Sequence, residues 1–179
     1  MKNFNELKVS FFESVKNTMP LYSIEICDLF NSIRAGRWKK EVDSCRMDLN
    51  KKRELPCFTP SGVYKERNSK SLIIYSGIIC LDIDNLDHPE ELKRVCKSIS
   101  WVWVVFISPS GRGLKIFIQT DSPLEKFKET EAEIAISFYE ITGYMRDDRA
   151  KDLARLQYVS FDQELYENLH PEIFEKRSR

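Results

Sequence analysis

The sequence lacks an excess of charge of either sign. Its 179 residues carry 28 Lys and Arg against 28 Asp and Glu, so the formal net charge is zero. Proteins that bind nucleic acid through the electrostatic field of the whole molecule are strongly basic, so this neutral composition excludes that kind of binding. Any contact with a phosphate backbone must therefore come from a local group of basic side chains.

Long apolar runs and paired cysteines are also missing. No run approaches the roughly 18 apolar residues of a membrane-spanning helix, and the first residues, MKNFNELK, lack the apolar core of a signal peptide. The five cysteines form no C-x-x-C pair and have no metal-site spacing. Their odd number and the apolar surroundings of Cys80 and Cys96 predict reduced, mostly buried thiols in a cytoplasmic protein.

What the sequence does contain fits one globular domain. Hydrophobic residues make up 42% and charged residues 31%, as in ordinary globular proteins, and no repeat, low-complexity tract or linker interrupts them. We therefore expect a single domain over residues 1–179, with its core at about 7–168.

Apolar periodicity predicts strands and helices that alternate along the chain. Strands are expected near 9–12, 72–75, 77–84, 101–107, 114–119 and 156–161, and helices at 23–36, 39–52, 89–99, 122–143 and shortly after Glu164. The segment 7–15 also fits a helical face, although we favour a strand there. Ser23 and Ser122 are expected to cap helices. The short loop after residue 107 requires an antiparallel hairpin, so we predict an α+β fold with a mixed or antiparallel sheet and packed helices.

Two aspartates interrupt the apolar run near the centre of the chain. Asp82 and Asp84 are two residues apart, so on a strand they face the same side, with Cα atoms roughly 6–7 Å apart. Carboxylates at this spacing suit a hard cation, and we expect Mg²⁺ or Mn²⁺. The alternative is a strand end at which both carboxylates are solvated.

A glycine-rich loop separates the next two strands. Its candidate phosphate-binding residues are Ser108, Ser110, Gly111, Arg112, Gly113 and Lys115. Glycines let backbone N–H groups surround an anion, and the basic side chains add positive charge. Lys115 is expected on the polar face of the following strand. An ordinary hairpin turn would also explain the glycines, and the spacing is not that of a P-loop.

Two further polar regions could complete such a site. Asp147 is the preferred third metal ligand, with Asp148 and Asp152 as alternatives, and Arg155 could hold a phosphate. A loop with Pro56, Pro60 and Gly62 is flanked by five basic residues that could form a nucleic-acid-binding lip, Lys51, Lys52, Arg53, Lys65 and Arg67. For both regions, the alternative is a solvated charged loop.

The order of these motifs resembles a known group of proteins. The matching pieces are Lys52-x-x-Leu55-Pro56, Thr59-x-Ser61-Gly62, Leu81-Asp82-Ile83-Asp84, Ser108-Pro109-Ser110-Gly111-x-Gly113-Leu114-Lys115, Asp152-Leu153-Ala154-Arg155-Leu156 and Ser160-x-Asp162. In this order the chain resembles the N-terminal domain family of virulence-associated protein E and related mobile-element proteins, within the archaeo-eukaryotic primase superfamily.

The resemblance implies an RRM-like primase-type core that uses nucleoside triphosphates and a divalent metal in bacterial mobile-element DNA replication. It implies catalytic and metal-binding roles for Asp82, Asp84 and Asp147, a nucleotide contact for Arg155, single-stranded DNA or a primer–template as partner, and a helicase domain or subunit beside it. Many primases have His where this chain has Lys115.

Three functions compete on these residues. The first is a primase-polymerase-like nucleotidyltransferase. The second is a catalytically silent nucleic-acid-binding or initiator module on the same fold, and the third is a metal-dependent nuclease that uses the same aspartates. Extension of a labelled primer with each metal and nucleotide set would separate them.

Overall fold

A computed structural model describes residues 6–146 and 152–174 of the chain. Its central layer is a four-stranded antiparallel sheet in the order β10-β7-β8-β6. These strands are β6 (Ile78–Ile83), β7 (Val102–Ile107), β8 (Leu114–Gln119) and the short β10 (Tyr166–Glu167). β7 and β8 form the expected hairpin, and β6 lies on the other side of β8.

A second sheet stacks beyond one face of the central sheet, with the order β2-β1-β3-β9. Its strands are β1 (Lys8–Phe12), β2 (Tyr22–Glu25), β3 (Cys57–Thr59) and β9 (Gln157–Tyr158). A small two-stranded sheet, β4 (Gly62–Tyr64) with β5 (Leu72–Tyr75), lies beside it. All of the strand pairs in these sheets are antiparallel.

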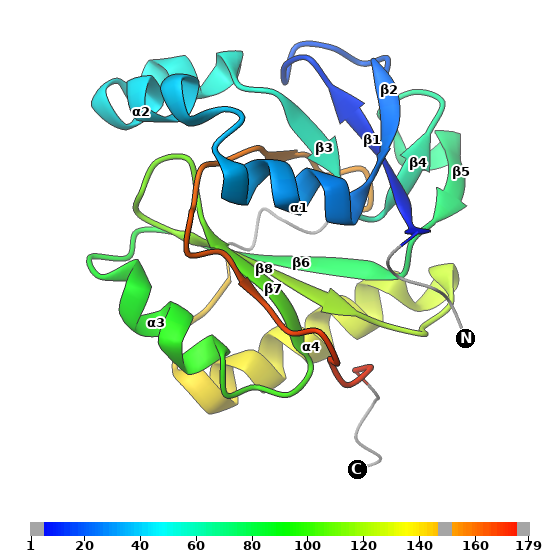
Figure 1. Cartoon of the computed structure of the whole chain (residues 1–179). Helices are drawn as coiled ribbons and strands as arrows, with labels where there is room; N and C mark the ends of the chain where they lie inside the picture. Colours follow the sequence, from blue (N-terminus) through cyan, green and yellow to red (C-terminus); the bar gives the residue numbers. More distant parts are fainter. Residues whose placement is uncertain (1–5, 147–151, 175–179) are drawn as a thin grey trace.

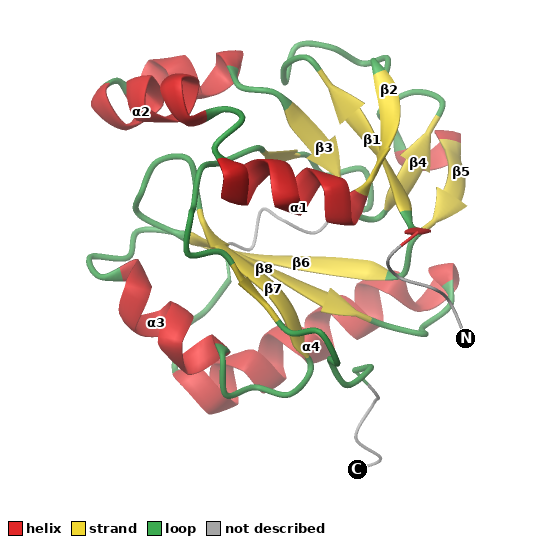
Figure 2. Ribbon diagram, in the orientation of Figure 1, coloured by secondary structure: helices red, strands yellow, loops and turns green. Residues whose placement is uncertain are grey.

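Helices cover both faces of the central sheet (Figures 1 and 2). α1 (Ile26–Ala35) and α2 (Lys39–Met47) belong to the side of the second sheet, and α3 (Pro89–Cys96) and α4 (Phe127–Thr142) cover the opposite face. Because side chains alternate along a strand, the sheet contributes to two cores. Phe106 and Phe117 pack with Phe30 of α1, whereas Leu81 and Ile116 pack with the residues of α3 and α4.

Several sequence predictions are confirmed. The fold is α+β with antiparallel sheets and several helices. Segment 7–15 contains a strand, and the run WVWVVFI is a strand buried on both faces. The N-terminal Pro89 of α3 and the left-handed Gly36 and Gly143 after α1 and α4 also lie where the sequence placed them.

Other local predictions are wrong. Ser23 does not cap a helix, because it pairs with Ser10 in the β1–β2 ladder and α1 begins only at Ile26. Ser122 hydrogen-bonds Thr130 within 2.7 Å, and a 3₁₀ turn precedes α4. The expected helix 39–52 ends at Met47 and continues as a 3₁₀ helix over Leu49–Glu54. The segment after Glu164 forms strand β10, since Tyr166 and Glu167 pair with β7.

The five cysteines are free thiols within the described residues. Cys45, Cys57 and Cys96 are buried, and burial raises the pKa of the Cys57 thiol to about 12. The prediction of reduced, mostly buried thiols is therefore confirmed for these three. Among the described residues, no helix has the length and apolar character needed to cross a membrane.

Candidate functional site

Asp82 lies in β6 directly opposite Lys115 of β8. The Lys115 ammonium forms an ion pair with Asp82 Oδ2, and both side chains are buried, with 3% and 6% of their surface exposed. Lys115 was expected on a polar face, and this is wrong. Its face of the sheet packs against α1 and the second sheet, so the lysine must neutralise a neighbouring carboxylate.

The two oxygens of Asp82 have different surroundings. Oδ2 contacts Lys115 and lies 3.8 Å from the Arg155 guanidinium. Oδ1 is buried and accepts no hydrogen bond from the parts of the chain that the structure describes. A buried carboxylate oxygen without a donor is costly, so Oδ1 is the position in this cluster at which a cation or a donor would be most favourable.

The loop Ser108–Gly113 folds against the end of β6. Ser108 N–H donates to the Gly113 carbonyl at 2.8 Å, and Leu86 N–H donates to the Arg112 carbonyl at 2.9 Å. A Cβ atom at Gly113 would lie 2.5 Å from the Ile83 carbonyl oxygen and 3.2 Å from Asp84 Oδ1. Gly113 is therefore required for the close approach that brings the loop to the half-exposed Asp84.

The same loop uses much of its own hydrogen-bonding capacity. Gly111 N–H donates to the Ser108 carbonyl at 2.9 Å, and the hydroxyls of Ser108 and Ser110 lie 3.0 Å apart. The exposed Arg112 lies 3.6 Å from Asp87. An anion here would therefore contact the serine hydroxyls and nearby cations more readily than the N–H groups expected from the sequence.

Of the three candidates for the third metal ligand, the structure describes only Asp152. Asp147 and Asp148 lie outside the described residues. Asp152 is exposed and closes a local turn, since its side chain accepts the Ala154 N–H at 3.2 Å and its carbonyl accepts the Arg155 N–H at 3.0 Å. Within residues 6–146 and 152–174, no group of three potential metal-ligating side chains comes together.

Two side chains that were given no role from the sequence hold the segment that carries Arg155. Ser61 and Tyr64 both donate to the Leu153 carbonyl, Tyr64 at 2.9 Å, and their hydroxyls lie 2.8 Å apart. Burial raises the pKa of Tyr64 to about 12, so it remains a donor at neutral pH. These contacts span about ninety residues of sequence. The sequence indicated only a loop there, from Pro60 and Gly62.

A second buried ion pair lies at the start of the Ser108–Gly113 loop. Lys93 of α3 binds both oxygens of Asp162 at 3.0 and 2.7 Å, and Asp162 also accepts the backbone N–H of Ile107 at 2.9 Å. Within α3 the apolar Val95 is exposed, whereas Lys93 is only 1% exposed. The partner Asp162 explains why a lysine occupies that position.

Three of the five basic residues of the predicted lip carry charges that act on Tyr158 of β9. The Lys52 ammonium lies 5.4 Å from the Tyr158 ring centre. Burial raises the pKa of Tyr158, and the charges of Arg53 and Arg67 partly oppose that rise. We call Lys52, Arg53, Arg67 and Tyr158 the Tyr158 cluster. Tyr158 itself was not predicted as a site residue.

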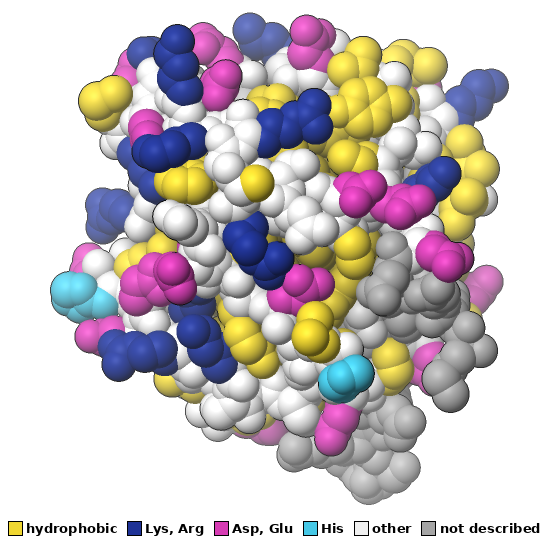
Figure 3. Space-filling model, in the orientation of Figure 1, with side chains coloured by type: hydrophobic (Ala, Val, Ile, Leu, Met, Phe, Trp, Pro, Cys, Tyr) yellow, Lys and Arg dark blue, Asp and Glu magenta, His cyan; other side chains and the backbone are white. Residues whose placement is uncertain are grey.

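The other two basic residues have different positions. Lys51 donates to the Ser44 hydroxyl at 2.8 Å, so it is directed toward α2. Lys65 is exposed in the turn after β4. Figure 3 shows that Lys and Arg side chains on the visible face are concentrated over the side of α2 and α3, with Asp and Glu between them. Positive charge is therefore local, as the neutral composition required.

Comparison with known proteins gives one match. The family model of the BT4734-like N-terminal domain matches residues 50–166, which include β3 to β9 and all placed residues of the candidate site. No curated protein matches the chain, and no solved structure does.

This match corrects the family expected from the sequence. The matching model is not that of the virulence-associated protein E N-terminal domain or of a primase. That assignment was wrong, and the primase and nucleotidyltransferase roles that depended on it are not carried further. Because the model covers well over half of the sequence, the chain belongs to the BT4734-like N-terminal domain family.

Proposed function

We propose that this domain binds a nucleoside triphosphate together with Mg²⁺ or Mn²⁺ at the end of β6. The observation that carries the proposal is the buried Asp82 Oδ1, which has no hydrogen-bond donor among the described residues. Asp84, two residues further, offers a second carboxylate at a half-exposed position. Mg²⁺ is commonly held by one or two carboxylates and the phosphates of its substrate, so this donor set fits.

The charges around Asp82 favour a ligand that binds together with a divalent cation. Asp82 and Asp84 are balanced by Lys115 and Arg155, so these four groups leave no positive surplus for a triphosphate. A bound divalent ion would neutralise phosphate charge there. Lys115 would hold the Asp82 carboxylate in place, Arg155 would contact phosphate oxygens, and the hydroxyls of Ser108 and Ser110 would donate to them.

The order of elements supports an RRM-like core as part of the same proposal. β6, α3 and β7 form a split β-α-β unit, with β8 between the two strands and α4 after β8, as in RRM-like cores. The last strand differs, because β10 follows β9 of the second sheet and pairs with β7 rather than with β6. Asp82 and Lys115 then lie on the sheet face opposite α3 and α4. In RRM domains that open face meets the ligand. Here α1 and the second sheet cover it, and the ligand would approach at the half-exposed Asp84 just after β6.

Replacement of Asp84 tests this function with little risk to the fold. We expect Asp84→Asn to weaken the binding of Mg²⁺-nucleoside triphosphate about 10- to 150-fold, the loss of one hydrogen bond or ligand to a charged group. Calorimetric titration of the unmodified protein with and without EDTA gives the reference values. Asp87→Asn is the matched control, because Asp87 is exposed and pairs only with Arg112 in the described structure. Equal affinity in all three proteins would refute the assignment.

A second candidate is suggested by the Tyr158 cluster, which could bind single-stranded DNA. The Lys52 ammonium lies over the Tyr158 ring, and the charges of Arg53 and Arg67 also act on Tyr158. Together they provide the charge and the stacking surface that such binding uses. A slope of about 0.7 in log affinity against log salt is expected for each neutralised phosphate, so three contacts predict a slope of about 2.

Charge reversal separates this binding from a nonspecific effect. Arg53→Glu should lower the salt slope by about 0.7 or more, because Arg53 is an exposed member of the cluster. Lys70→Glu is the control, since Lys70 is exposed outside the cluster. Fluorescence anisotropy with a labelled oligonucleotide measures both slopes. Identical effects of the two variants would exclude the cluster as the DNA-binding surface.

A further inference from the structure

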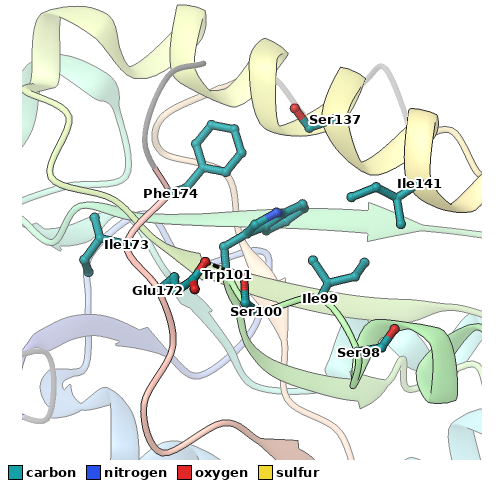
Figure 4. Close-up of a pocket in the computed structure, with 9 residues that line it drawn as sticks. All are labelled: Ser98, Ile99, Ser100, Trp101, Ser137, Ile141, Glu172, Ile173 and Phe174. Carbon is teal, nitrogen blue, oxygen red and sulfur yellow. Dashed lines mark hydrogen bonds between the residues drawn. The ribbon is translucent and has the colours of Figure 1, made fainter. Parts of the chain in front are cut away.

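A hollow opens on the α3 and α4 side of the central sheet, on the face opposite Asp82 (Figure 4). Its volume is about 710 Å³, within the range of about 300–1,000 Å³ typical of small-molecule sites. The walls come from the turn before β7, from α4 and from the segment that ends at Phe174. This hollow is separate from the nucleotide site proposed above, because the sheet lies between them.

Trp101 forms the apolar centre of the hollow. Figure 4 shows its indole between Phe174 and Ile141. Phe174 meets the indole edge-on with ring centres 5.3 Å apart, and Phe138 of α4 does so at 6.5 Å. These two contacts fix the orientation of the ring, while Trp101 remains only half-buried. A half-exposed indole held in this way offers a surface for an apolar body or a cation.

One carboxylate is held at the wall beside this ring. The Ser100 hydroxyl donates to Glu172 Oε2 at 2.5 Å, and the Glu172 N–H donates to the Ser100 carbonyl at 3.1 Å. Glu172 is the one charged residue among the described residues that line the hollow. The hollow therefore joins a fixed negative charge to an aromatic and aliphatic surface, with no cation among its described lining residues to neutralise that charge.

From this geometry we infer a second ligand site, which takes a small organic cation with an apolar body. The ammonium or guanidinium group would pair with Glu172 close to the Trp101 indole, and the apolar body would contact Ile99 and Ile141. Such a ligand satisfies the charge of the wall and covers the apolar surface in one step. An uncharged ligand would cover the apolar surface but leave the Glu172 carboxylate unpaired, and an anion would be repelled by that carboxylate.

Three probes with one apolar body test the dependence on charge. They are 4-phenylbutylammonium, 4-phenylbutanol and 4-phenylbutyrate, titrated into the full chain by ligand-observed NMR. For probes of this size we expect binding of the ammonium in the low millimolar range. An exposed ion pair with a cation–π contact predicts about fivefold tighter binding than that of the alcohol, and the carboxylate should bind most weakly.

Variants locate the site. Glu172→Gln keeps an acceptor for Ser100 and should remove the fivefold preference for the ammonium. Ile141→Arg places a cation at the mouth and should abolish binding. Ile136→Arg is the matched control, because Ile136 is on the same helix at 51% exposure, against 48% for Ile141, but does not line the hollow. No saturable binding below about 10 mM, equal affinity for all three probes, or equal effects of the two arginine variants would overturn the inference.

Discussion

Replacing Gly62 with alanine is expected to destabilise the protein by about 3–5 kcal/mol. Two causes combine at this residue. Its φ of 149° is a backbone conformation that side chains with a Cβ rarely adopt, and an added Cβ would lie 1.9 Å from the Ile74 carbonyl oxygen. That oxygen belongs to the backbone of β5, which cannot move without breaking its pairing with β4.

Gly143→Ala provides the matched control for this prediction. Gly143 also has a positive φ, 76°, but a Cβ there would meet no atom within 4 Å. Only the cost of the left-handed conformation applies, which is about 1–2 kcal/mol. Urea unfolding of both variants measures the two costs. If Gly62→Ala loses no more stability than Gly143→Ala, the close approach of β4 and β5 is not as described.

The second large effect is expected at the buried ion pair of Lys93 and Asp162. Lys93→Ala should cost about 3–5 kcal/mol, because it leaves the Asp162 carboxylate buried without its counter-ion. Asp162 also accepts the Ile107 N–H just before the glycine-rich loop. Loss of the lysine should therefore loosen the loop as well, with faster amide hydrogen exchange at Ser108 and Gly111.

Arg94 gives the appropriate comparison within the same helix. It is adjacent to Lys93 but exposed, so Arg94→Ala should change the free energy of unfolding by less than about 0.5 kcal/mol. The double variant Lys93→Met with Asp162→Asn should be less destabilised than the sum of the two single changes, since no buried charge then lacks a partner. Additive losses in that cycle would contradict the pairing.

The central strands could be predicted because their signal is local. Alternating or continuous apolar runs between turn residues placed β6, β7 and β8, and the short loop after Ile107 fixed the hairpin. The strands β9 and β10 have two residues each and depend on distant partners, β3 and β7. The strand expected at 156–161 is present as β9. Nothing in the sequence of β10 separates it from a loop or a short helix, so the segment after Glu164 was wrongly expected to be helical.

The candidate site was predictable in its composition but not in its pairings. Strand alternation predicted Asp82 and Asp84 on one side, but β6 ends at Ile83, so only Asp82 lies within the strand. Glycine spacing indicated a close approach, which Gly113 makes. The sequence could not indicate that α1 and the second sheet cover the face of Lys115, because that packing joins segments remote in the chain. For the same reason, the contacts from Ser61 and Tyr64 to Leu153 gave no local signal.

The central claim is that Asp82 Oδ1 and Asp84 hold a divalent ion with a nucleotide. The most direct measurement is the anomalous diffraction of Mn²⁺ in crystals grown with a non-hydrolysable nucleoside triphosphate. We predict a manganese peak within about 2.0–2.3 Å of both carboxylates, with the phosphates near Arg155 and the Ser108–Gly113 loop. Bound nucleotide elsewhere on the protein, or a nucleotide in this site with no manganese on Asp82, would contradict the account.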